Sequence, residues 1–210
     1  MSTATLTASS IFKSIFPESD WTELAPADYD EVFQKLTNAG TYNATAASFM
    51  QRAKIKLGFH QQYKSGAGWT VLHNITLAPG AQLTDAYVLC LISHELFHLQ
   101  QPILMRLSVQ GELLAWQYQR QAYNELTGKD IGDQGEAYAG TKQHWDELAL
   151  LSTDSRDDLL AAQELMKKVA PDYRSDCLPL FPLEKEIRGF LKQGKIMEAI
   201  NVVWNLVTCR

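Results

Sequence analysis

Apolar residues in the first third of the chain recur every three or four positions, the spacing of a helix with one buried face. After an N-terminal arm over residues 1–27, this spacing predicts a helix over 28–38, which ends near Gly40, and a second short helix over 44–53. The arm carries one short apolar patch at residues 11–16, followed by prolines. We expect the arm to be only partly ordered.

The period then changes from helical spacing to alternation. Residues 55–63 alternate between apolar and polar side chains, and residues 69–77 are rich in residues that favour strands. Residues 64–68 between them contain two glycines and polar residues typical of a turn, and Pro79-Gly80 ends the second run. The pattern predicts an antiparallel hairpin.

An almost entirely apolar helix follows the predicted hairpin. Thr84 is a suitable N-cap for it, and Pro102 disfavours helical geometry at the preceding residue, so the helix should stop at Gln101. Because apolar residues surround most of its circumference, we expect this helix to be buried. A short connection leads to Ser108, which can cap a helix over 109–126 that is closed by Thr127-Gly128.

The remainder of the chain is predicted to be helical. Segments with helical spacing cover residues 135–151, 154–169, 183–193 and 195–208, separated by polar turns and prolines. The expected fold class is α+β. We divide the chain into the arm at 1–27, a catalytic core at 28–128 and a C-terminal helical subdomain at 129–210.

Charge and composition narrow the function classes. The 210-residue chain has a net charge of −5, and its longest basic run is Lys167-Lys168, so we expect no nucleic-acid partner. The N-terminus lacks a basic start followed by an apolar core, and no stretch is long and apolar enough for a membrane span. Three widely spaced cysteines argue against a disulfide scaffold. The expected location is the cytoplasm, without membrane attachment, and the sequence leaves the oligomeric state open.

The apolar helix contains the residues with the clearest chemistry. His94 and His98 lie four positions apart, about 40° around the helix axis, so their imidazoles can converge on one ion. Glu95 projects about 100° away from His94, too far to be a third ligand but close enough to reach a water held by the metal. Buried histidines and a buried glutamate need partners. The pattern therefore predicts a metal site with an adjacent base.

A catalytic zinc usually has three protein ligands, so a third is expected downstream. Glu112 lies at the start of the next helix, and two helices joined by a short connection pack as antiparallel neighbours, which would bring Glu112 towards His98. Cys90 lies on the His94 face, but we expect it to be a small buried apolar residue. Other candidates for the third ligand are Asp130, Asp133 and Glu136.

The residues His94-Glu95-Leu96-Phe97-His98, followed by Glu112-Leu113-Leu114-Ala115, resemble the gluzincin metallopeptidases, and most of all their small, minimal members. The resemblance covers residues 55–128 and implies a zincin-like core. It implies that His94, His98 and Glu112 hold Zn²⁺ and that Glu95 is the general base and acid. It also implies that the strand at 69–77 is the edge along which an extended peptide lies.

These inferences predict a zinc-dependent peptidase, a metalloprotease of the hydrolase class, acting as an endopeptidase on peptides or proteins. The tetrahedral oxyanion needs a further donor, for which His144 is the first choice. The alternative donors are Tyr118, Tyr123, Tyr138 and His73.

Two other functions fit the same residues. One is an effector that cleaves a single protein partner and docks it on the C-terminal helices. The other is a non-catalytic zinc-binding module for regulation or protein interaction. Glu95 weighs against the non-catalytic module, because a purely structural site fills its fourth position and does not need this glutamate.

Overall fold

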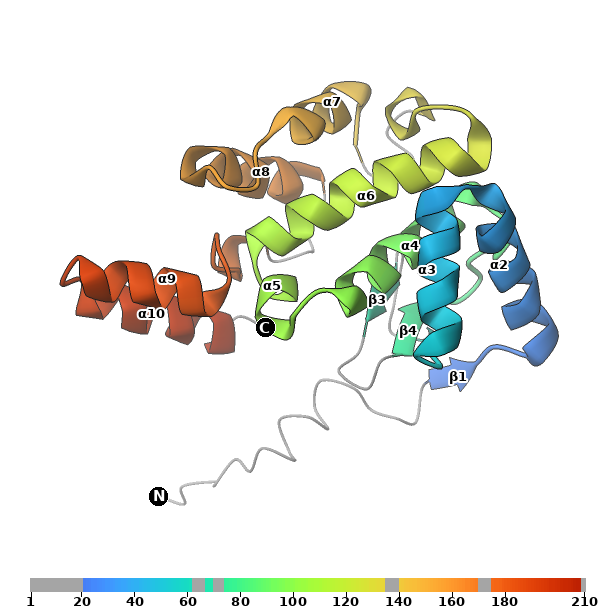
Figure 1. Ribbon diagram of the computed structural model, residues 1–210, viewed down its shortest axis with the longest axis horizontal. Coiled ribbons are helices and arrows are strands. Elements are labelled where there is room, and N and C mark those ends of the chain that lie inside the picture. The colour runs from blue at the N-terminus through green and yellow to red at the C-terminus, as the bar shows by residue number, and fades with distance from the viewer. Residues whose placement is uncertain (1–20, 62–66, 70–73, 135–139, 170–174, 209–210) are drawn as a thin grey trace, which may run out of the picture.

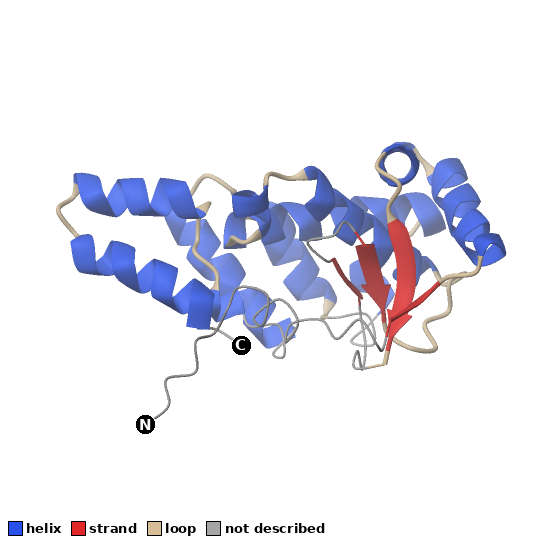
Figure 2. Ribbon diagram, turned by 90° about the horizontal axis from the view of Figure 1, so that it is seen from below, coloured by secondary structure: helices blue, strands red, loops and turns tan. Residues whose placement is uncertain are grey.

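The computed structural model describes residues 21–61, 67–69, 74–134, 140–169 and 175–208. These residues form an α+β fold, as predicted, with a small sheet and many helices. Figure 2 shows the strands gathered in one half of an otherwise helical molecule. Within the described ranges, no helix combines the length and the apolar character needed to cross a membrane.

The sheet is mixed and has the strand order β1-β2-β4-β3. Its strands are Trp21–Glu23 (β1), Lys56–His60 (β2), Ala67–Trp69 (β3) and Asn74–Leu77 (β4). β4 runs parallel to β2, whereas β1 and β3 are antiparallel to their neighbours. The predicted antiparallel hairpin is therefore wrong. Residues 67 and 68, assigned to the turn, belong to β3, and the additional reversal through β3 makes β4 run in the same direction as β2.

One face of the sheet is covered by three helices, which supply most of the first core. These are Pro26–Ala39 (α2), Thr41–Arg52 (α3) and Ala86–Gln100 (α4). Leu57 and Ile75 on the sheet are fully buried in one cluster with Leu36 of α2, Met50 of α3 and Leu96 of α4. Both helices predicted before the sheet are present, and each begins two or three residues earlier than expected.

The start of α3 is capped by a residue far away in the sequence. The Glu125 carboxylate accepts the backbone N–H groups of Tyr42 and Asn43, at 2.9 and 3.0 Å, while α3 has no side-chain cap of its own. Gly40 makes room for this contact, since a Cβ at that position would lie 2.4 Å from the Glu125 side chain. A local pattern cannot reveal such a cap, which explains why the predicted start at residue 44 was late.

Two helices after the sheet form the centre of the molecule (Figure 1). α4 is capped by Asp85, whose side chain accepts the Tyr87 N–H, and not by Thr84 as predicted. The short helix Ile103–Arg106 (α5) leads to the long helix Val109–Thr127 (α6). The predicted caps of α6 are confirmed, with Ser108 at its start and Gly128 in the left-handed region, at φ 69°, after its end.

A second core lies on the other side of α6. It is formed with Lys142–Leu150 (α7) and Arg156–Val169 (α8), and it buries Trp145 and Leu159 against Leu113. The predicted helix at 135–151 is shorter in the described part, because a 3-10 helix, Ile131–Gln134 (η2), precedes it and Thr141 caps it. Residues 135–139 lie outside the described ranges.

The chain continues through a 3-10 helix, Ser175–Cys177 (η4), to two further helices, Leu183–Lys192 (α9) and Ile196–Thr208 (α10). α9 and α10 are both present as predicted. Cys177 is disulfide-bonded, a pairing that the wide spacing of the cysteines did not predict. Cys90 is free and buried, as predicted.

Candidate metal centre

α4 and α6 pack as antiparallel neighbours, which is the arrangement that the short connection predicted (Figure 1). Contacts between the two helices run in opposite sequence directions. Gln101 contacts Gly111, His98 contacts Glu112, and Cys90 contacts Gln119. This register places the first turn of α6 beside the last turn of α4, and so brings Glu112 to the two histidines.

The position of Glu112 depends on the tight start of α6. Ser108 Oγ accepts the Gly111 N–H at 3.1 Å and donates to the Met105 carbonyl at 2.7 Å. Gly111 allows this turn to lie close to α5, since a Cβ there would come within 2.0 Å of the Met105 carbonyl oxygen. Any larger residue would push the start of α6, and Glu112 with it, away from α4.

The three predicted ligands form one compact group. His98 Nε2 lies 3.0 Å from Glu112 Oε1, His94 Nε2 lies 3.9 Å from Glu112 Oε2, and the two Nε2 atoms lie 3.1 Å apart. One ligand atom from each residue lies within 4.8 Å of the other two. All three side chains are buried. Helix spacing predicted the convergence of the rings, and the short connection between the helices predicted the approach of Glu112; the structure brings all three together.

The hydrogen bonds of His98 orient its ring. Gln101 donates its amide N–H to the Gly111 carbonyl at 3.1 Å, so its carbonyl oxygen faces His98 Nδ1, also at 3.1 Å. This arrangement favours a proton on Nδ1 and turns Nε2 towards Glu112. A histidine held in this way through one nitrogen is typical of metal ligands, whose second nitrogen is oriented by a neighbouring acceptor.

The two histidines have opposite protonation tendencies. Burial lowers the pKa of His98, but the charge and hydrogen bond of Glu112 outweigh this effect and raise the pKa to about 9. Burial and the neighbouring His98 lower the pKa of His94 to about 3. At neutral pH a proton on His98 therefore bridges to Glu112, while His94 stays neutral and keeps a lone pair. A bound cation would take the place of that proton.

Glu95 lies beside the group on α4 and is almost completely buried, with 7% of its surface exposed. Burial, together with the negative charge of Glu112, raises the pKa of Glu95 to about 7. The positive charge of His98 opposes this shift but is outweighed. A carboxyl group with a pKa near neutral can both accept and return a proton. The role of Glu95 as a base that is not itself a ligand stays a prediction.

The spacing of the donor atoms suits a small divalent cation. Zinc bonds of about 2.0–2.2 Å in tetrahedral geometry place neighbouring ligand atoms about 3.3–3.6 Å apart. One donor atom from each of the three residues lies within 4.8 Å of the other two, so a shift of a few tenths of an ångström to about one ångström would give this spacing. Two imidazoles and a carboxylate are a donor set that zinc shares with other first-row metals.

Aromatic side chains shield the same group. The rings of His94 and Trp116 have centroids 6.5 Å apart, and Trp116 in turn packs on Trp145 of α7 at 5.1 Å. Trp116 follows Glu112 by one helical turn and therefore lies on the same face of α6.

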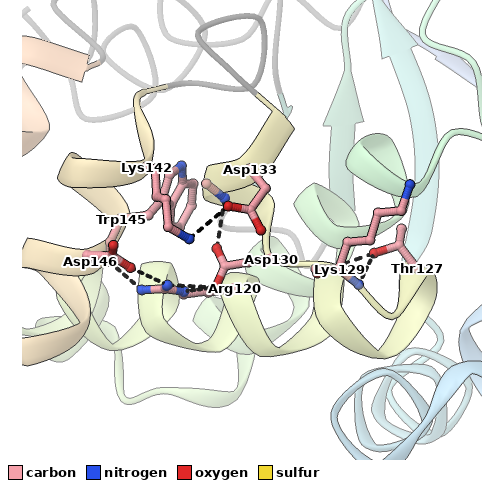
Figure 3. A network of polar contacts seen from close by, with 9 residues as sticks. Arg120, Thr127, Lys129, Asp130, Asp133, Lys142, Trp145 and Asp146 are labelled. Atoms are coloured by element: carbon pink, nitrogen blue, oxygen red, sulfur yellow. Dashed lines mark hydrogen bonds and ion pairs between the residues drawn. The ribbon is translucent and has the colours of Figure 1, made fainter.

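The other candidates for the third ligand are engaged elsewhere. Asp130 binds Arg120, and Asp133 binds Lys142, in a separate polar network that Figure 3 shows. Glu136 lies outside the described residues. Cys90 donates to the Tyr87 carbonyl, and burial raises the pKa of its thiol, which fits a small buried residue rather than a thiolate ligand.

The candidate oxyanion donors lie in varied surroundings. His144 Nδ1 accepts the Thr141 backbone N–H at 3.2 Å in the capping box of α7, and within the described part of the chain no hydrogen bond joins it to the three ligands. The Tyr118 hydroxyl donates to the Tyr42 carbonyl, and Tyr123 is buried in the second core. His73 and Tyr138 lie outside the described residues. The role assigned to His144 stays a prediction.

The predicted substrate edge needs correction. Residues 74–77 form β4, which is paired on both sides, with β2 and with β3. Among the described strands, β3 is the edge next to β4. The correction follows from the mixed sheet, because β3 occupies the side of β4 that the predicted hairpin left open.

Sequence reasoning missed Gln101, which was treated only as the end of α4. Gln101 both ends the helix and orients His98. The signal in the sequence that could have revealed this second role is a polar residue three positions after a candidate ligand. No protein-family model, curated protein or solved structure matches the chain. The candidate site therefore rests on its own residues and geometry.

Proposed function

We propose that this protein is a zinc-dependent peptidase. The observation that carries the proposal is the buried group of His94, His98 and Glu112 with Glu95 beside it. His94, His98 and Glu112 would hold the metal through two ring nitrogens and a carboxylate. When bound in such a site, zinc acts as a Lewis acid on a carbonyl and lowers the pKa of water. The gluzincin resemblance supports the same assignment.

Glu95 would move the proton in this reaction. Its carboxylate takes a proton from the attacking water as the oxygen forms a bond to the peptide carbonyl carbon. It then gives that proton to the amide nitrogen as the carbon–nitrogen bond breaks. A pKa of about 7 suits both steps, because the group is neither too weak a base nor too weak an acid at neutral pH.

The substrate would be a peptide in extended conformation. An exposed strand edge can pair with such a chain through backbone hydrogen bonds. β3 offers this edge among the described strands, and it packs against α4, which carries Glu95. Pairing along β3 gives little side-chain selectivity by itself, which is consistent with an endopeptidase.

The test is the Glu95→Gln variant in the zinc-loaded protein. We expect it to bind zinc as the wild type does and to cleave an unfolded protein at least about a hundredfold more slowly, the usual effect of losing a general base. Glu184→Gln on the exposed face of α9 is the matched control and should cleave at the wild-type rate.

Two results would contradict the proposal. Tight zinc binding with no cleavage of any peptide in a diverse library would favour a non-catalytic zinc-binding module. Equal cleavage by wild type and Glu95→Gln would remove Glu95 from the mechanism.

A further inference from the structure

The last two helices form a hairpin that projects from the body of the molecule (Figure 1). α9 packs on α10, and α9 is tied to the rest through α5 and through the Arg156–Glu186 ion pair at 3.2 Å. The hairpin carries none of the residues of the proposed metal centre. Its role must therefore be sought in its surface.

α10 is apolar around more of its circumference than α9 covers. The residues with the least exposure, Ala199, Val202 and Leu206, lie three and four positions apart on one face, which is the face towards α9. A second row of large apolar residues lies beside that face and is open. These exposed side chains are Ile196, Met197, Ile200, Val203, Trp204 and Val207. A helix that is apolar around most of its circumference is normally buried.

The open surface has the size of a protein interface. The exposed fractions run from 37% at Val203 to 71% at Val207, and Leu191 of α9 adds a further side chain that is 53% exposed. Together these seven side chains offer roughly 800 Å², the area that each partner contributes to a standard interface. Patches on monomeric proteins rarely exceed a few hundred Å².

The apolar row on α10 is complementary to itself. When two copies of α10 are placed antiparallel, with the midpoint between Asn201 and Val202, Ile196 lies opposite the partner's Val207. In the same register, Ile200 lies opposite the partner's Val203. Four of the six large residues of the row therefore meet one another across the twofold axis, as an interface with this symmetry requires.

Size and charge agree with the same register. Trp204 lies opposite the partner's Ala199, and Ala199 is the smallest residue lining the apolar groove between α9 and α10. The large ring of one copy thus faces the space above the small residue of the other. The polar face of α10 carries one charge, Glu198, which lies opposite the partner's Asn205, so no like charges meet on these faces.

We infer that the α9–α10 hairpin is the docking surface for a second copy of this chain, through antiparallel pairing of α10 with its counterpart. Four helices, two from each copy, then enclose the apolar row, as in a four-helix bundle. The two metal centres lie outside this contact, so the inference does not depend on the proposed peptidase activity.

The first experiment measures mass in solution. Sedimentation velocity on the full chain should show a concentration-dependent dimer, and Ile200→Glu with Val203→Glu should raise its dissociation constant at least about a hundredfold, because each substitution buries an unpaired charge twice. Leu160→Glu, on an equally exposed apolar residue of α8, is the control and should leave the dimer intact.

A second experiment tests the register. Ile200→Cys and Val203→Cys proteins, mixed in equal amounts and oxidised, should form a cross-linked dimer that neither forms alone, with the wild type as background. A parallel pairing would instead cross-link each variant with itself and would overturn the proposed arrangement.

Other results would overturn the proposal itself. The proposal would be wrong if the wild type stayed monomeric at about 100 µM while its helix content showed that the hairpin was intact. Flotation of that monomer with anionic lipid vesicles would assign the surface to a membrane instead. A double variant that dimerises like the wild type would exclude this face.

Discussion

α6 carries two polar clusters that differ in one respect. Near its middle, Arg120 donates to Asp130 at 2.8 Å, to Asp146 at 2.5 Å and to the Trp145 carbonyl at 2.7 Å (Figure 3). Near its start, Glu112 lies with His94 and His98. The Arg120 network brings its own permanent cation, whereas the Glu112 cluster has a positive charge only while His98 holds a proton.

The pKa shifts express this difference. Burial raises the pKa of Asp130, but the hydrogen bond from Arg120 and that from the Gly132 N–H outweigh it, so the pKa is lowered and the carboxylate stays charged. In the other cluster, burial raises the pKa of Glu95 and lowers that of His94. The Arg120 network, whose charges balance internally, connects α6 to α7. The Glu112 cluster lacks a fixed cation and is therefore suited to bind one.

The largest expected effect separates the two clusters by metal affinity. His98→Ala and Glu112→Gln each change one of the three proposed ligands, so zinc affinity should fall on the order of a thousandfold. Asp130→Asn, in the Arg120 network, should change it less than about twofold. Competition with a chromogenic chelator measures all three. A large loss of zinc affinity in Asp130→Asn would instead place the metal site in the Arg120 network.

The next effect concerns pH in the metal-free protein. Because the pKa of His98 is raised from 6.5 to about 9, its contribution to the free energy of unfolding is fully present below pH 6.5 and is lost as pH rises through 9. His94 stays neutral in this interval, and Glu95, whose pKa is raised to about 7, adds a smaller fall of the same sign at its lower end. We expect the free energy of unfolding to fall on the order of 1–3 kcal/mol between pH 6.5 and 9. Urea titrations at a series of pH values measure it.

Substitution of His98 checks the origin of this pH dependence. His98→Gln should flatten the profile near pH 9, while the contribution of Glu95 near pH 7 remains. Zinc should reverse the slope, since the ligands must lose protons to bind it. An unchanged slope in His98→Gln would assign the effect to another group.

A smaller effect is expected at the Arg120 network. Arg120→Met removes one donor from two carboxylates and a carbonyl, but Asp130 keeps the Gly132 N–H, and Asp146 is 46% exposed and can be solvated. The free energy of unfolding should therefore fall by about 2 kcal/mol, with zinc affinity unchanged. Thermal unfolding and the same chelator competition measure the two quantities. A parallel loss of zinc affinity would show that the clusters are coupled through α6.

The smallest expected effect comes from the residue that orients His98. Gln101→Ala removes the acceptor at His98 Nδ1, and zinc affinity should fall about tenfold, the lower end of the effect of outer-shell partners. Gln100→Ala, one position earlier on the exposed side of α4, is the matched control. Equal affinity in both variants would mean that the packing of the ring alone orients it.

The sequence by itself determined the features that depend on neighbouring residues. The spacing of His94 and His98 places both rings on one helix face, and Ser108, Gly128 and Pro102 fix where helices begin and end through local backbone geometry. The short connection after α4 leaves an antiparallel neighbour as the compact solution, so the approach of Glu112 could be predicted as well.

Tertiary structure decided what depends on distant residues. The direction of β4 follows from the pairing of β3, and the start of α3 depends on Glu125 from another helix. The same holds for the partner of Asp130, because only the fold places Arg120 beside this carboxylate. A side chain's partners are set by the packing of whole helices, and no local pattern contains that information.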